Sequence, residues 1–395
     1  MKPSGFKVNL FWDRYSLASL CLLAFCVSLG TATVSLSKAL VLLGFAACIV
    51  FNYKYLIEFI SSRTYLIFIW MFAAVMWMLI SMTWSQAAEL TQWQYFYAHT
   101  RFLWVAIIFF QIRTRERGLI VLKWLIFGQI FVLCVSWLLW LGVEVPFTRI
   151  PKEKGIAFTS TLEQPVMLVL VLVAIWNFRK YFSKQWGIWF VRLVILAAAF
   201  NLVFVMSGRS GYIVFLLVVG HQIYKVLPDR LRWVALMSPF ILSAIFYVAS
   251  PVFHKRISEI TTNTGIYFKN ENLSHHVTTS EEVRLDMWRT TALGIVKKPI
   301  LGYGVGSMPE LYKGEYELIK TPVSQPHQQY LFWWTEFGLV GLMIMLFFFL
   351  ALLKDAGKLD LEAKSSLQSV LIVLFIMGMF NCPFFGVGMG EFFFL

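Results

Sequence analysis

Long apolar runs separated by short polar connections dominate the chain. Eleven of them predict membrane-spanning helices, because about 20 apolar residues cross a bilayer in helical form. They lie near residues 15–33, 36–52, 65–83, 96–112, 118–143, 163–178, 186–206, 210–224, 233–250, 329–353 and 366–381. A further run near 384–395 is short and rich in glycine, and it predicts a partial span.

Composition indicates the same class of protein. The 395 residues are 59% hydrophobic and only 14% charged, with a mean hydropathy of +0.71, whereas a soluble domain is about 45–50% apolar and about 25% charged. The chain therefore has too little polar surface for a water-facing globule. We expect an all-α integral membrane protein with about 12 transmembrane helices, which excludes a soluble enzyme tethered by one anchor.

The positive charges predict the orientation in the membrane. Lys and Arg recur in alternate connections, starting with the basic N-terminus, and are almost absent from the opposite short ones. Because such connections stay in the cytoplasm, we expect a cytoplasmic N-terminus on a retained first helix. Three regions follow: helices about 1–9 in residues 1–250, an outer loop domain in 251–328, and helices about 10–12 in 329–395. The net charge of +13 is then topological, and no basic cluster interleaved with aromatic residues suggests nucleic-acid binding.

The long connection contains a predicted helix in TSEEVRLDMWRTTALGIVKKP. Thr279 and Glu282 have the spacing of a capping box, and Pro299 marks the end of the helix. The alternating glycines in the following ILGYGVGSMPE differ from a dinucleotide-binding fingerprint. We therefore expect a tight turn after this helix.

Arg209 is the first candidate for chemistry. It lies among small residues in MSGRSGYI, where two apolar runs meet at the outer face. Small residues allow a tight turn, and no neighbour in the sequence can neutralise the arginine, so it can bind an anion. The alternative is an interfacial arginine that extends toward lipid headgroups.

Arg284 and His327 are the other two candidates. Arg284 lies early in the predicted loop helix, where acidic neighbours offer the alternative of a surface ion pair, and Arg289 is a second candidate on that helix. His327 immediately precedes a long apolar helix, whose positive N-terminal end favours a neutral, proton-accepting imidazole. The alternative for His327 is a hydrogen-bonding anchor. Together, two guanidinium groups and an imidazole suit a diphosphate and a hydroxyl nucleophile.

Other polar residues in the apolar runs are candidates of the same kind, because ionisable groups at membrane depth are costly. His99 and Arg101 either line the same cavity or anchor the outer interface, and Glu336 points inward if the site lies near it. The five aspartates include no DxD pair, and the neighbouring His275 and His276 do not share a helix face. We expect no bound metal.

These motifs resemble the O-antigen ligase family of Gram-negative bacteria, within a wider group that includes O-antigen polymerases and protein O-oligosaccharyltransferases. Three segments carry the resemblance: MSGRSGYI, VRLDMWRTTALGIVKKPILGYGVGSM and PHQQYLFWWTEFGLVG. They cover about residues 200–345; before them only the number and rhythm of spans match.

The resemblance implies a GT-C-like glycosyltransferase in the bacterial inner membrane. Such an enzyme moves a polysaccharide from undecaprenyl diphosphate to a sugar of the lipid A core on the periplasmic face, within membrane lipid and without metal or cofactor. Arg209 and Arg284 would bind the donor diphosphate, and His327 would be the general base. Further substrate-binding residues implied are Arg289, Arg101, His99, Gln328 and Tyr330. Relatives often have asparagine at the position of Gln328. We expect a monomer.

Three alternatives stay open at the level of sequence. An O-antigen polymerase would use the same donor, and Arg209 precedes Gly220 at the R-x10-G spacing associated with polymerases; the single long loop favours a ligase. A protein O-oligosaccharyltransferase would have a longer C-terminal portion. A transporter would place charged or broken helices at mid-membrane in both halves, whereas the candidate residues here gather at one face.

Overall fold

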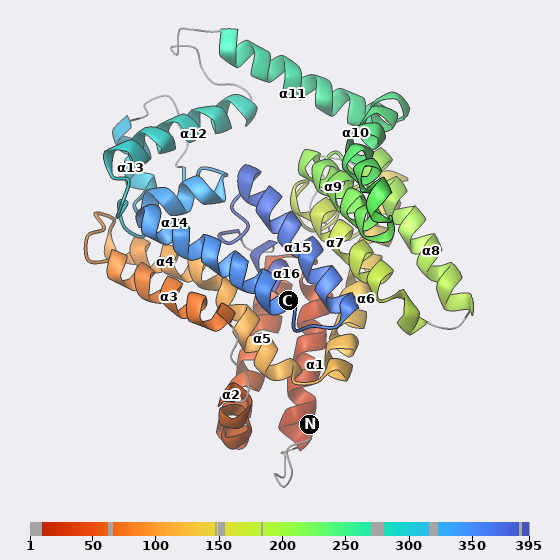
Figure 1. Cartoon of the computed structure of the whole chain (residues 1–395), viewed down its shortest axis with the longest axis horizontal. Coiled ribbons are helices and arrows are strands. Elements are labelled where there is room, and N and C mark those ends of the chain that lie inside the picture. Colours follow the sequence, from red (N-terminus) through yellow and green to blue (C-terminus); the bar gives the residue numbers. More distant parts are fainter. Residues whose placement is uncertain are drawn as a thin grey trace. The chain divides into compact units, whose positions relative to one another are not determined.

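The computed structural model describes residues 10–61, 66–146, 148, 155–182, 185–269, 280–315, 323–386 and 389–394. Every regular element in these ranges is a helix, and they contain no strand (Figure 1). The predicted all-α class is therefore confirmed.

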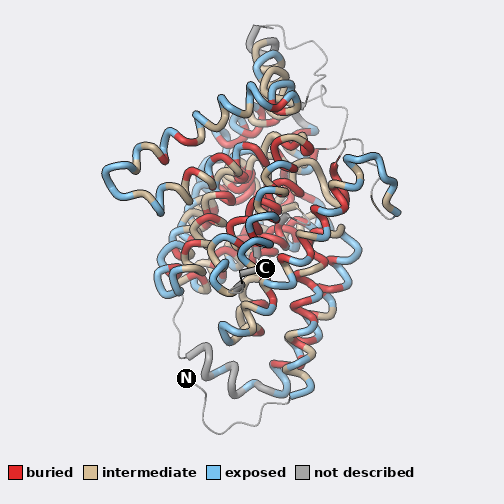
Figure 2. Tube along the Cα trace, turned by 90° about the vertical axis from the view of Figure 1, so that its right-hand side faces the viewer, coloured by how far each residue is buried: buried red, intermediate tan, exposed pale blue. Residues whose placement is uncertain are grey.

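Six segments of the described chain are long and apolar enough to cross a membrane: Thr31–Phe51, Arg115–Trp140, Gly187–Val205, Asp229–Ala249, Gln329–Ala356 and Leu361–Phe380. Leu66–Ser81 and Glu163–Asn177 are shorter apolar helices. Large apolar side chains on these helices are often exposed, up to 87% at Val248, and exposed positions recur along the helices in Figure 2. Such surface fits contact with lipid. The chain is a multi-pass membrane protein, and the total of about 12 spans stays a prediction.

The chain divides into two compact units, the first comprising Met1–Leu66, Phe102–Gly211 and Val387–Leu395. Within it α1 packs against α2 and α6, and α7 packs against α6 and α8. Its elements are α1 (Leu10–Cys26), α2 (Thr31–Ser61), α5 (Trp104–Ile112), α6 (Arg115–Trp140), α7 (Glu163–Asn177), the 3₁₀ turn η2 (Arg179–Phe182), α8 (Gln185–Phe200), the π-helical turn η3 (Asn201–Val205) and α16 (Met389–Phe394).

The second unit comprises Ile67–Arg101 and Tyr212–Gly386. Within it α12 packs against α13 and α14, and α14 packs against α15 (Figure 1). Its elements are α3 (Leu66–Ser81), α4 (Glu89–His99), most of α9 (Arg209–Val226), η4 (Asp229–Leu231), α10 (Arg232–Ala249), α11 (Pro251–Lys269), α12 (Ser280–Lys297), α13 (Met308–Glu315), α14 (Gln329–Ala356) and α15 (Leu361–Phe380).

Besides the run at 15–33, which contains the turn between the end of α1 at Cys26 and the start of α2 at Thr31, two apolar runs differ from uninterrupted helices. The run at 96–112 is divided, because α4 ends at His99 and a 3₁₀ turn, η1 (Thr100–Leu103), precedes α5. The run at 329–353 forms α14, but Gly338 inside it has a non-helical φ of 68° and ψ of −173°. Apolar composition does not reveal either break, since the flanking residues suit a helix equally well.

The long connection is more helical than the sequence predicted. The expected helix is present as α12, which ends at Lys297, just before Pro299. Thr279 of the predicted capping box lies outside the described residues. Two additional helices, α11 and α13, flank α12 in the same connection.

Candidate active site

His327 lies two residues before α14 in a conformation that is rare for a side chain other than glycine. Its φ is 51°, in the left-handed region, which costs on the order of 1–3 kcal/mol and is typical of functional sites. Gln328 forms the N-cap of α14, where its side-chain oxygen accepts a hydrogen bond from the Leu331 amide at 2.5 Å. The start of α14 therefore holds His327 in a defined position.

Asn381 is the hydrogen-bond partner of the His327 ring. Its Oδ1 lies 3.3 Å from Nδ1 of His327, and it follows α15 directly. An amide oxygen accepts a hydrogen bond, so Nδ1 carries the proton and Nε2 carries the lone pair. Asn381 was not among the residues predicted from the sequence, because a single asparagine after an apolar run carries no signal of its own.

The surroundings of His327 favour its neutral form. Burial is the main factor that lowers the pKa of the imidazole below its usual value, and the positive charge of Arg284 lowers that pKa further. The hydrogen bond to Asn381 acts in the opposite direction on the pKa. A histidine of this kind is unprotonated at neutral pH and can accept a proton from a hydroxyl.

Arg284 is half-buried on α12. A hydrogen bond connects this helix to the residue that precedes His327. Trp288, one turn after Arg284, donates a hydrogen bond from Nε1 to the carbonyl of Pro326 at 2.9 Å. The structure thus brings Arg284 and His327 into one region of the second unit. Arg289, on the same helix, is exposed.

Three other predicted site residues have partners within the protein. His99 Nε2 lies 3.0 Å from Oε2 of Glu336, with both side chains fully buried. Arg101 donates to the carbonyl of Phe385, and the Tyr330 hydroxyl donates to the carbonyl of Phe375 at 2.8 Å. These contacts give each side chain a place in the protein framework; a role of any of them in substrate binding stays a prediction.

Arg209 is the first residue of α9 and belongs to the first unit. The π-helical turn η3 ends at Val205, four positions before it, and such turns are frequent at functional sites. A Cβ atom at Gly208 would collide with the carbonyl oxygen of Thr161 and lie 2.9 Å from Cγ of Pro165. The small residue beside Arg209 is therefore required by close packing. Convergence of Arg209 with the residues of the second unit stays a prediction.

Metal ligands do not gather in the part of the chain that the structure describes, where no group of three or more His, Cys, Asp or Glu side chains is placed to hold an ion. In the described part of the second unit, the groups with a clear chemical use are the charged Arg284 guanidinium and the neutral His327 ring. Their arrangement suits an anion beside a proton acceptor.

The sequence of the chain matches known proteins. Residues 194–346 match the family model described as O-antigen ligase, which confirms the resemblance drawn from the sequence. The matched range contains Arg209, Arg284 and His327. An uncharacterized protein of Haemophilus influenzae is 24% identical over 238 residues, which are 57% of this chain and 57% of that protein. The chain thus matches somewhat over half the length of this relative.

Proposed function

We propose that this chain, whose residues 194–346 match the O-antigen ligase family, is a membrane glycosyltransferase that transfers O-antigen polysaccharide from undecaprenyl diphosphate to the lipid A-core oligosaccharide. The reaction takes place on the periplasmic face of the inner membrane. The observation that carries the proposal is His327, oriented by Asn381 and held neutral by burial and by Arg284.

The chemistry follows from these groups. Nε2 of His327 takes the proton from a hydroxyl of the acceptor sugar while that oxygen attacks the anomeric carbon of the donor. The bond between this carbon and the diphosphate oxygen breaks, and the lipid diphosphate leaves with the bonding electrons. Attack from the opposite side inverts the anomeric configuration.

The leaving group needs stabilisation because negative charge develops on it. Guanidinium groups bind phosphate oxygens in pairs and stay charged at any relevant pH. Arg284 has this role in the second unit, and Arg209, the other arginine of the matched segments, has the same role toward the diphosphate. Preorganised positive charge lowers the barrier without an additional group.

A polymerase is the second candidate, because it would use the same donor and the same residues. The spacing from Arg209 to Gly220 fits it. The two functions differ in the acceptor, which is a lipid A-core sugar for the ligase and another lipid-linked glycan for the polymerase. A deletion strain separates them: loss of the ligase leaves long polymers on the lipid carrier, and loss of the polymerase does not.

The direct test is transfer by the purified protein in lipid nanodiscs, with undecaprenyl diphosphate-linked glycan, lipid A-core and a chelator. We expect transfer by the unchanged protein and none by His327→Ala. His254→Ala is the matched control, because His254 is an exposed histidine of the same long connection. Full transfer by His327→Ala, or dependence of the unchanged protein on a divalent cation, would contradict the proposal.

A further inference from the structure

The glycine-rich turn between α12 and α13, residues 298–307, packs against α14 at its break and is called the glycine turn below. The non-helical Gly338 leaves backbone groups of the helix without their usual partners, and the turn supplies new ones. Three backbone hydrogen bonds form in this way: Tyr303 N to Thr335 O at 2.9 Å, Gly304 N to Glu336 O at 2.8 Å, and Leu339 N to Pro299 O at 2.9 Å. The turn and α14 are therefore linked by backbone hydrogen bonds, and we call this contact the joint between them.

Close packing makes glycine necessary in this turn. Gly304 has a φ of 90°, and a Cβ atom there would lie 2.7 Å from the Ser81 carbonyl oxygen and 2.7 Å from Cα of Ser85. The Val305 amide donates to Oγ of Ser81 at 3.3 Å, and Oγ of Ser85 donates to the Val305 carbonyl at 2.8 Å. The turn is thus inserted between the end of α3 and the break in α14.

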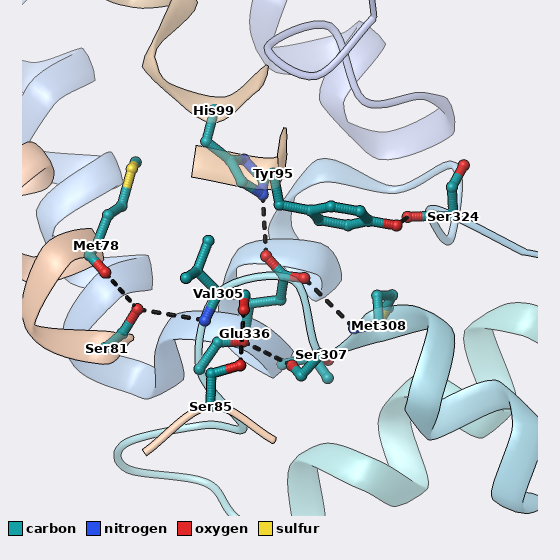
Figure 3. Close-up of polar contacts among 12 residues, drawn as sticks. Met78, Ser81, Ser85, Tyr95, His99, Val305, Ser307, Met308, Ser324 and Glu336 are labelled. Atoms are coloured by element: carbon teal, nitrogen blue, oxygen red, sulfur yellow. Dashed lines mark hydrogen bonds and ion pairs between the residues drawn. The ribbon is translucent and has the colours of Figure 1, made fainter. Parts of the chain in front are cut away.

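The Glu336 side chain contacts both α4 and the residue directly after the glycine turn. Its Oε2 lies 3.0 Å from Nε2 of His99, at the end of α4. Its Oε1 accepts a hydrogen bond from the amide of Met308, the first residue of α13, at 3.4 Å. Figure 3 shows the Glu336 side chain between His99 and the turn.

The pair is enclosed by aromatic rings. The His99 ring lies 4.8 Å from Phe332, 5.1 Å from Phe337 and 5.2 Å from Phe385, measured between ring centroids. Within the described residues Nδ1 of His99 is buried without a hydrogen-bond partner, so the contact with Glu336 is the one hydrogen bond of the ring there. Removing one member of such a buried pair leaves the other without compensation.

This joint connects the two parts of the candidate site in the second unit. The turn begins directly after α12, which carries Arg284, and Glu336 lies on the same half of the broken α14 that His327 precedes. We propose that the Glu336–His99 pair is a positioning unit that locks the glycine turn into the break of α14 and thereby places Arg284 relative to His327. This inference rests on the proposed transferase function.

A pair that served stability alone would show the same burial, so the test needs a matched buried acid. Asp355 is 6% exposed and lies at the other end of α14, where it accepts a hydrogen bond from the Ile67 amide at 3.1 Å and pairs with Lys358 at 2.7 Å. Asp355→Ala therefore removes a buried carboxylate of the same helix at a distance in sequence from the turn.

The experiment combines hydrogen exchange with kinetics on the full chain in nanodiscs. Glu336→Ala should speed the amide exchange of residues 300–308 and lower kcat about 10–100-fold, the loss associated with misplaced catalytic groups. Asp355→Ala should speed exchange only at the start of α3 and leave kcat within about twofold. If Glu336→Ala does not fold, Glu336→Gln replaces it. The double variant His99→Gln with Glu336→Gln, in which two amides can pair, should recover part of the lost rate and protection.

The outcomes separate the two levels of the proposal. Unchanged exchange of the turn in the Glu336 variants overturns the locking role. Faster exchange with an unchanged kcat overturns the placement of Arg284 and His327. Full activity of His327→Ala instead contradicts the transferase mechanism, and the exchange data then still decide whether the pair locks the turn.

Discussion

Nδ1 of His327 lies 3.3 Å from Oδ1 of Asn381, across 54 positions of sequence. The contact joins the start of α14 to the residue that follows α15. It selects the ring nitrogen that can act as a base, since the other nitrogen donates to the amide oxygen.

Replacing Asn381 should alter the rate and the pH dependence separately. Asn381→Ala removes one hydrogen bond and should lower kcat by about 2–10-fold, given its usual net contribution. Asn381→Asp places a negative charge beside the ring, which favours the imidazolium and raises its pKa. The acid limb of kcat/KM should then move to higher pH, and a limb unchanged in Asn381→Asp would exclude His327 as the titrating base.

The unchanged protein should keep its activity below the pH at which an ordinary histidine becomes protonated, about 6.5. Burial and Arg284 lower the pKa of His327, and activity falls only when the pH drops through that lowered value. Arg284→Gln removes a positive charge, so the pKa should rise and the acid limb should move up. Arg284→Lys keeps the charge and should leave the limb in place while raising the donor KM.

Arg209 should be required as a guanidinium. Arg209→Ala should abolish transfer, and Arg209→Lys should retain only a part of it, because an ammonium group cannot form the paired hydrogen bonds to a diphosphate. Arg192, an exposed residue of α8, is the control, and Arg192→Ala should behave like the unchanged protein. Equal activity of Arg209→Lys and the unchanged protein would argue against paired binding of phosphate oxygens.

The glycine turn should be intolerant of side chains. Gly304→Ala combines a positive φ with a Cβ atom 2.7 Å from backbone, and we expect it to destabilise the protein by about 2 kcal/mol or more. Gly265 in α11 has open space around its Cβ position, so Gly265→Ala should be neutral or stabilise by up to about 1 kcal/mol. Thermal unfolding in nanodiscs measures both, and equal melting temperatures would contradict the packing at Gly304.

Local sequence patterns were enough to predict the helical membrane class, the helix that ends before Pro299, and Arg209, Arg284 and His327 as candidates. These features depend on hydropathy, on helix-ending residues and on motifs, all of which lie within short stretches of chain. The same patterns did not predict that the run at 96–112 is divided or that α14 breaks at Gly338, because apolar residues suit both sides of each break.

Contacts between distant residues had to come from the packing of the helices. Glu336 meets His99 across 237 positions, and Asn381 meets His327 only because the end of α15 lies beside the start of α14. A single polar residue in an apolar run shows no periodic pattern, so the sequence does not predict which residue it will contact. Which buried polar side chain pairs with which is decided by how the helices approach one another, since a polar group in an apolar interior must find its partner there.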